Sequence, residues 1–226
     1  MTEITLREVE TTSDPRYAVI WLHGLGADAS DFEPVVPELG LADAPGVRFI
    51  FPNAPYRPVT CNGGYVMRAW YDIVSLDATN RTIDEAGLIE SRDLVWQLIA
   101  REVERGIPGN RIFLAGFSQG GAVAYLAGLS YPEPLAGIVA LSTYIPSARL
   151  LEETLSEANR RIPIFAAHGS DDDVVSPELG ARAADLLRHQ GYAIDWHDYR
   201  MPHSVCAKEI GDIGAWLGER LVVAPH

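Results

Sequence analysis

Cysteine is almost absent from this 226-residue chain, which contains only Cys61 and Cys206. Two cysteines cannot form the disulfide framework on which small secreted domains depend. Neither of them belongs to a cluster with the spacing of metal ligands. The sequence therefore favours a reducing, cytoplasmic location and predicts no metal site.

Long apolar runs and excess basic charge are also missing. No stretch approaches the ~20 apolar residues that a membrane-spanning helix needs, and the opening MTEITLREVE is acidic and polar, unlike a secretory leader. The formal net charge of -13 argues against nucleic acid or an anionic membrane as the main partner. The oligomeric state is left open, with a homodimer among the alternatives.

What the chain does contain is an alternation of strand-like and helix-like segments. Strands are predicted at Tyr17–Leu22, Val47–Phe51, Arg111–Ala115, Gly137–Leu141, Ile162–Ala167 and Ala193–Tyr199. Helices are predicted near Asp31–Leu39, Ile83–Arg105, Gln119–Leu129, Ala148–Asn159, Pro177–Gln190 and Ser204–Arg220. Thr82 and Glu85 are expected to form a capping box at the start of the longest helix. This pattern predicts one α/β domain over residues 1–226, with a mostly parallel sheet covered by helices on both faces.

The stretch Gly116-Phe117-Ser118-Gln119-Gly120 joins a predicted apolar strand to a predicted apolar helix. Such a sharp turn forces the residue at its apex into a strained conformation, and only very small side chains fit two positions before and after it. The pattern is that of the G-x-S-x-G nucleophile elbow, which exposes the serine at the carboxyl edge of the sheet. A glycine-rich turn with a solvated serine is the alternative, because short motifs recur by chance.

Two other strand ends carry residues that would complete a catalytic site. Asp171, Asp172 and Asp173 follow one predicted strand, and His203 follows the last one. A serine becomes a good nucleophile when a histidine, oriented by a carboxylate, takes its proton. The order serine, acid, histidine is that of the α/β-hydrolase fold. His168 precedes the acids, so a structural role is expected for it. A solvated acidic turn and a surface histidine are the alternatives for the individual residues.

The stretch His23–Gly26 follows the first predicted strand and allows two interpretations. In the first, the backbone N–H groups of Leu25 and Gln119 form an oxyanion hole. In the second, the glycines begin the G-x-G-x-x-A fingerprint of dinucleotide-binding proteins. That fingerprint requires an acidic residue at the end of the second strand, which is missing here, and Pro34 and Pro37 suit the next helix poorly. A nucleotide-dependent oxidoreductase is therefore disfavoured.

Over nearly its whole length the chain resembles the carboxylesterase and acyl-protein thioesterase family of α/β-hydrolases. The matching stretches are LHGLGADASDF, FPNAP, NGGYVMRAWYDI, GFSQGGAVA, HGSDDDVV and MPHSV. The resemblance implies a serine hydrolase of short-to-medium acyl esters, with acyl-protein thioesterase and lysophospholipase activities as alternatives, and no cofactor. It assigns Ser118 as the nucleophile, Asp172 as the acid, His203 as the base, and Leu25 and Gln119 as oxyanion donors. The AWYDI stretch looks closer to bacterial carboxylesterases than to thioesterases of lipidated proteins.

The stretch Asn53–Asp77 is predicted to be a long loop that forms the wall of an acyl pocket, because loops of this length are usually functional. Its aromatic residues Trp70, Tyr71 and Tyr65 are the expected substrate-binding residues, and a surface loop pinned by its aromatics is the alternative. Between Ser142 and Ile162, where many lipases carry a lid domain, there is room for one short helix. We therefore expect no lid and an open, shallow cleft.

Two classes of function fit the sequence. The first is an active serine esterase, and the second is a catalytically silent ligand-binding module of the same fold. The second is disfavoured because every catalytic position is filled by a residue of the required type.

Overall fold

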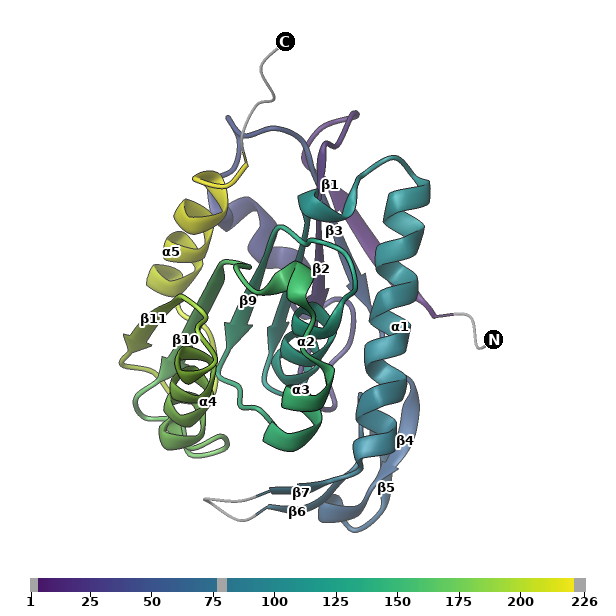
Figure 1. Ribbon diagram of the computed structural model, residues 1–226, viewed down its shortest axis with the longest axis vertical. Coiled ribbons are helices and arrows are strands. Elements are labelled where there is room, and N and C mark those ends of the chain that lie inside the picture. The colour runs from purple at the N-terminus through teal and green to yellow at the C-terminus, as the bar shows by residue number, and fades with distance from the viewer. Residues whose placement is uncertain (1–3, 77–80, 222–226) are drawn as a thin grey trace.

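The centre of the computed structural model is a seven-stranded sheet; the structure describes residues 4–76 and 81–221. The strands are β1 (Leu6–Glu10), β2 (Tyr17–Leu22), β3 (Val47–Pro52), β8 (Ile112–Phe117), β9 (Gly137–Leu141), β10 (Ile164–Gly169) and β11 (Ile194–Tyr199). Their order is β1-β3-β2-β8-β9-β10-β11 (Figure 1). β1 pairs antiparallel with β3, and every other neighbouring pair is parallel. The predicted, mostly parallel sheet is confirmed.

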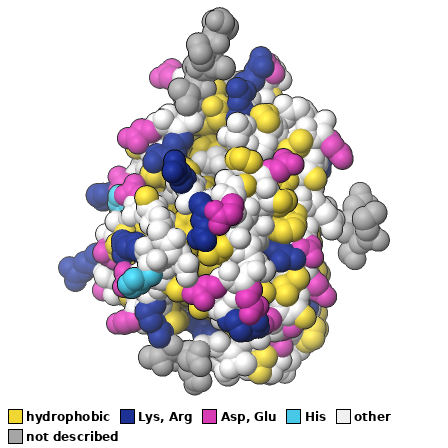
Figure 2. Space-filling view, viewed as in Figure 1, with side chains coloured by type: hydrophobic (Ala, Val, Ile, Leu, Met, Phe, Trp, Pro, Cys, Tyr) yellow, Lys and Arg dark blue, Asp and Glu magenta, His cyan; other side chains and the backbone are white. Residues whose placement is uncertain are grey.

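Helices cover both faces of this sheet. They are α1 (Glu85–Glu104), α2 (Gln119–Ser130), α3 (Ala148–Thr154), α4 (Pro177–His189) and α5 (Ala207–Gly218), with short 3-10 helices η1 (Glu33–Leu39), η2 (Thr60–Asn62), η3 (Gly109–Arg111) and η4 (Glu157–Asn159). Helices α1, α2, α3 and α4 lie over the near face in Figure 1, and Figure 2 shows the side chains of the same face. Within the described ranges, no helix combines the length and the apolar character needed to cross a membrane.

Strand β2 shows how the sequence builds two cores at once. Successive side chains of a strand point to opposite faces. Ile20 and Leu22 accordingly join the core under α1 and α2, whereas Val19 and Trp21 join the core under η1 and α5. Because both faces are covered, the strand is apolar at every position, as is typical of parallel sheets.

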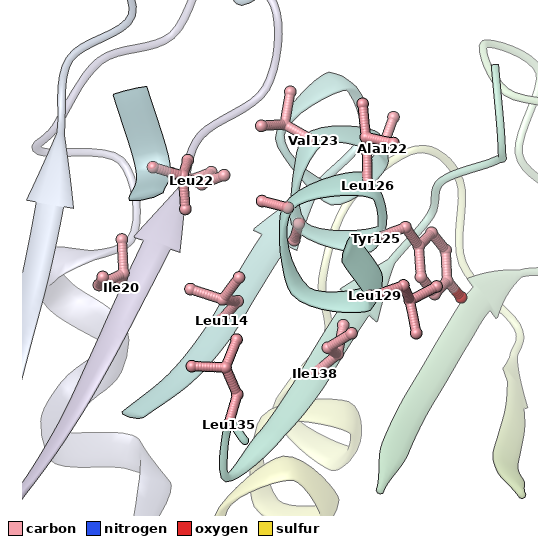
Figure 3. Close-up of a cluster of buried hydrophobic side chains, with 14 of the residues drawn as sticks. Ile20, Leu22, Leu114, Ala122, Val123, Tyr125, Leu126, Leu129, Leu135 and Ile138 are labelled. Atoms are coloured by element: carbon pink, nitrogen blue, oxygen red, sulfur yellow. The ribbon is translucent and has the colours of Figure 1, made fainter. Parts of the chain in front are cut away.

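Helix α2 is the innermost helix of the fold. Every residue from Gln119 to Ser130 is buried, which is why its sequence is apolar all round rather than amphipathic. Figure 3 shows its side chains Val123, Leu126 and Leu129 above those of the strands beneath it. This burial fixes the start of α2, where Ser118 lies.

The start of α1 differs from the expected capping box. The N-cap residue is Asp84, whose carboxylate accepts a backbone N–H two residues further on at 3.1 Å. Thr82 lies in the preceding strand β7 (Arg81–Ile83), and the Glu85 carboxylate pairs with Ser147 and Arg149 instead. The prediction was wrong because the helix begins two residues later, where an aspartate is already a good cap.

The predicted long loop also differs from the structure. It contains the antiparallel pair of β4 (Tyr56–Val59) and β5 (Tyr65–Arg68). It also contains β6 (Ile73–Leu76), which pairs antiparallel with β7 beyond the end of the predicted loop. The end of the predicted loop, Asp77, lies outside the described residues. The single helix predicted over Ala148–Asn159 is divided into α3 and η4.

Glu209 in the first turn of α5 is an unusual buried acid. Its side chain is fully buried, and neither carboxylate oxygen has a hydrogen-bond partner among the described residues. Burial raises the pKa of Glu209 to about 8; the backbone N–H of Cys206 opposes this shift, and the nearby charge of Asp212 adds to it. Glu209 is therefore protonated in the folded protein near neutral pH.

This burial makes the stability depend on pH. Above pH 6.5 the unfolded chain has lost the Glu209 proton that the folded protein keeps, so the free energy of unfolding falls as the pH rises toward 8. Between about pH 6.5 and about pH 8.5, the free energy of unfolding of wild type should fall by about 2 kcal/mol more than that of Glu209→Gln. Urea unfolding at both pH values measures the difference. The exposed acid Glu104 supplies the control, since Glu104→Gln should keep the wild-type dependence of the free energy of unfolding on pH. Equal slopes for wild type and Glu209→Gln would contradict the assignment.

Candidate active site

Ser118 stands at the junction between β8 and α2, at the carboxyl edge of the sheet. Its backbone has φ 54° and ψ -119°, a combination that residues other than glycine rarely adopt. The Ser118 N–H donates to the Leu141 carbonyl of the neighbouring strand at 2.9 Å, which holds the turn in place. The strain predicted for the apex of an elbow is therefore present.

The glycines around Ser118 are required by close backbone contacts. A Cβ atom on Gly116 would lie 2.4 Å from the backbone of Gly120, and one on Gly120 would lie 2.3 Å from the Leu22 carbonyl oxygen. Both distances are far below any real contact of a Cβ atom. The steric explanation drawn from the sequence agrees with this geometry.

Asp172 and His203 form a short, partly buried acid–base pair. The Asp172 Oδ2 atom lies 2.7 Å from His203 Nδ1, while Oδ1 accepts the N–H groups of Val174 at 2.9 Å and Val175 at 2.8 Å. Burial alone would raise the pKa of Asp172, but hydrogen bonds from His168, His203 and the Val175 N–H outweigh it and lower this pKa well below its usual range. Asp172 is therefore ionised at neutral pH and accepts the Nδ1–H of His203.

The other two aspartates of the loop point away from this pair. The Asp171 side chain is 60% exposed, with Arg200 Nε 3.8 Å from its carboxylate, and Asp173 is exposed. Of the three acids, the structure brings only Asp172 to His203.

The His203 ring lies beside the elbow. Its centroid is 4.6 Å from that of Phe117, the residue before Ser118. No hydrogen bond joins the Ser118 hydroxyl to the His203 ring within the described residues. Such bonds are often long in unliganded enzymes and tighten when a substrate is bound.

His168 and His23 are fixed by their own partners. His168 Nε2 lies 2.8 Å from the Val175 carbonyl and 3.4 Å from Asp172, so His168 supports the acid loop. His23 Nδ1 lies 2.7 Å from the Gly24 carbonyl, and its Nε2 accepts the Ala54 N–H at 3.0 Å. Since a carbonyl can only accept, the proton of His23 is on Nδ1. Burial lowers the pKa of His23, which keeps the ring neutral.

The N–H groups of Leu25 and Gln119 are both placed near Ser118. Gln119 is the first residue of α2, where backbone donors have no partner within the helix. Among the described residues, no backbone hydrogen bond uses the N–H of Leu25. A Cβ atom on Gly24 would lie 3.6 Å from Ser118 Cβ, so the Leu25 turn packs against the serine. Two such backbone donors in the stretches next to Ser118 are the kind of groups that bind an oxyanion.

The Gln119 side chain joins this edge to the stretch after β5. Its Oε1 accepts the Trp70 N–H and its Nε2 donates to the Tyr71 carbonyl, each at 2.7 Å. The Trp70 indole Nε1–H then donates to the His23 carbonyl at 2.9 Å. The sequence analysis missed this connection, although a glutamine in an otherwise apolar helix was a signal for it.

The three expected substrate-binding residues have different surroundings. Trp70 and Tyr71 have no exposed surface, and the Tyr71 hydroxyl lies 3.0 Å from that of Tyr144. Without exposed surface these two side chains cannot contact a substrate, so the structure does not support that role for them. Tyr65 is 69% exposed on the β4–β5 hairpin. Its role stays a prediction.

A parallel sheet with a strained serine elbow, and an aspartate–histidine pair at the same edge, defines an α/β-hydrolase. The profile of the phospholipase/carboxylesterase family matches residues 5–219, so the chain belongs to this family and is a hydrolase. It is 38% identical to acyl-protein thioesterase 1 of Mycosarcoma maydis, with 93% of each chain covered. It is 34% identical to carboxylesterase SOBER1 of Arabidopsis thaliana, with 91% of each covered.

Solved structures agree with the sequence relatives. The crystal structure of Arabidopsis thaliana SOBER1 has a TM-score of 0.85 at 33% identity, covering 92% of this chain and 100% of that one. The Bacillus cereus carboxylesterase shares the fold, with a TM-score of 0.75 at 18% identity over 95% of this chain and 94% of that one. Relatives named acyl-protein thioesterase and relatives named carboxylesterase both match this chain, so the narrower placement with bacterial carboxylesterases that AWYDI suggested stays a prediction.

Proposed function

We propose that this protein hydrolyses acyl esters and thioesters through a covalent acyl-enzyme on Ser118. The observation that carries the proposal is the 2.7 Å contact between Asp172 and His203, with the His203 ring against the elbow residue Phe117. The strained backbone of Ser118 and the closeness of the acid–base pair to the elbow support this assignment.

In the proposed reaction, Ser118 Oγ attacks the acyl carbon while His203 Nε2 accepts its proton. The carbonyl oxygen becomes an oxyanion, which the N–H groups of Leu25 and Gln119 stabilise. His203 then gives the proton to the leaving alkoxide or thiolate. A water molecule attacks the acyl-enzyme by the same steps and releases the acid. The ionised Asp172 stabilises the imidazolium that forms in each half of the cycle.

Thioesters are included because of the names of the relatives. Several fungal proteins at 38–41% identity are called acyl-protein thioesterase 1. The same residues suit both reactions, because a thiolate leaves more easily than an alkoxide and asks less of His203. We propose short-to-medium acyl chains as the preferred substrates.

A fluorophosphonate probe tests the nucleophile directly. Wild type should be labelled at Ser118, and Ser118→Ala should not be labelled. The same variant should lose about 10⁶ in kcat, because serine and histidine act as a unit. Ser13→Ala, on an exposed bend, provides the control and should behave as wild type. A loss below about tenfold would exclude Ser118 as the nucleophile. Paired p-nitrophenyl esters and thioesters of increasing chain length then rank the substrates.

The choice among the three aspartates is tested by amide substitutions. Asp172→Asn should cost about 10² to 10⁴ in kcat, because the amide loses the negative charge and its NH2 group can donate to His203 Nδ1, which favours the wrong tautomer. Asp171→Asn and Asp173→Asn remove the same charge from exposed positions and should each cost less than about tenfold. Steady-state kinetics on one ester compares the three. If either exposed position proves more damaging than Asp172, the acid has been misassigned.

The indole of Trp70 offers a test of the oxyanion hole. Trp70→Phe keeps a ring in the core but removes the hydrogen bond that holds the His23 carbonyl, next to the Leu25 turn. We expect kcat to fall about tenfold, less than the loss of a whole donor. The preference for oxygen esters over thionoesters should also shrink, because that preference depends on the hole. Trp96→Phe is a matched control, since its indole donates to the Ala127 carbonyl at 3.0 Å away from the site. Equal effects of both substitutions would refute the positioning role.

A further inference from the structure

A cleft of about 490 Å³ lies between β7, the stretch after β9 and α4, and we call it the arginine cleft. Its lining includes Arg81, Tyr144, Ile145, Leu179, Arg182 and Leu186. These residues come from β7, the stretch after β9, and α4, which meet at the carboxyl edge of the sheet (Figure 1).

The walls of the cleft are connected to the nucleophile and to the acid. Tyr144 follows Thr143, whose Oγ1 donates to the Ser118 carbonyl at 2.6 Å. On the other side, the Arg81 guanidinium donates to the Val174 carbonyl, and the Val174 N–H donates to Asp172 at 2.9 Å. Since consecutive Cα atoms are 3.8 Å apart, the cleft begins within roughly 10 Å of both catalytic residues. This distance is short enough for one substrate to reach from Ser118 to the cleft.

The charge of the cleft is positive in a strongly acidic protein. The Arg81 guanidinium lies 4.9 Å above the Tyr144 ring, and no carboxylate of the described residues is within ion-pair distance of it. Its Nε atom is buried and has no hydrogen-bond partner there. Arg182 adds a second guanidinium, whose charge also acts on Glu178 of the same helix, while the acid of the lining, Asp185, is paired with Arg188 at 3.0 Å. The formal net charge of -13 would not have predicted a positively charged cleft.

We propose that the arginine cleft binds a carboxylate or phosphate group of the substrate, so that the enzyme prefers anionic esters or thioesters. This inference rests on the proposed function. A guanidinium matches the planar fork of these anions. The apolar side chains of Ile145, Leu179 and Leu186 would pack against the methylene groups between the anion and the ester. The anion can belong to the acyl group or to the leaving group.

Two pairs of substrates show whether the anion belongs to the acyl group or to the leaving group. The acyl pair is the p-nitrophenyl monoester of glutaric acid and its neutral methyl ester. The leaving-group pair is the acetate ester of 4-hydroxyphenylacetic acid and that of its methyl ester. For wild type, kcat/KM should be about tenfold higher for the anion in one pair, and that pair identifies the source. The preference should weaken as salt is added, because salt screens the attraction.

Substitution of the arginines then tests whether the preference for anionic substrates arises in the arginine cleft. Arg81→Gln and Arg182→Gln should each lower the anionic-to-neutral ratio of kcat/KM about three- to tenfold. Arg16→Gln changes the net charge equally at an exposed position next to the opposite edge of the sheet and should leave the ratio unchanged. The inference is overturned if wild type hydrolyses the neutral esters without preferring the anions. It is also overturned if both arginine variants keep the wild-type ratio, which would leave Arg81 as a support of the Val174 loop alone. Absence of all hydrolysis and of Ser118 labelling would instead refute the proposed function.

Discussion

The buried amide of Gln119 is the contact on which the geometry of this edge depends. Both ends of the amide are used, one on the Trp70 N–H and the other on the Tyr71 carbonyl. Breaking either bond would leave a buried polar group without a partner, which costs about 1–3 kcal/mol. Through the Trp70 indole the same connection reaches the His23 carbonyl, so the two sides of the proposed oxyanion hole are held by one stretch of chain.

Such rigidity is needed because Ser118 has a strained backbone. A residue at φ 54° keeps that conformation only when its surroundings leave no alternative. Here Gly116 and Gly120 allow backbone to pack directly on backbone, and the fully buried α2 prevents the turn from relaxing outward. The strain at the serine is thus balanced by the packing of the central helix.

The parts of the fold that follow from local patterns were predictable, and those that depend on distant partners were not. Strand β2 and helix α2 are apolar at every position, so their burial is evident in the sequence. The steric need for small residues around a serine elbow likewise accounts for Gly116 and Gly120 from the sequence pattern alone. By contrast, β1 is half exposed and pairs with a strand some 40 residues away, as the contact of Glu8 with Ile50 shows. The orientation of Trp70 depends on Gln119, 49 positions further on, and an aromatic residue between two strands does not reveal which way it points.

The proposed catalytic groups and the lining of the arginine cleft belong to different parts of the chain. Ser118, Asp172 and His203 lie at ends of sheet strands or directly after them, and their positions are fixed by backbone contacts such as those of Val174 and Val175 with Asp172. The lining comes from a hairpin and from helix surfaces, where side chains can change without moving the sheet. This separation gives a physical reason why relatives at similar identity are named both thioesterases and carboxylesterases. The difference between them would then be found in the residues that surround the cleft, because the chemistry at the serine is the same for both reactions.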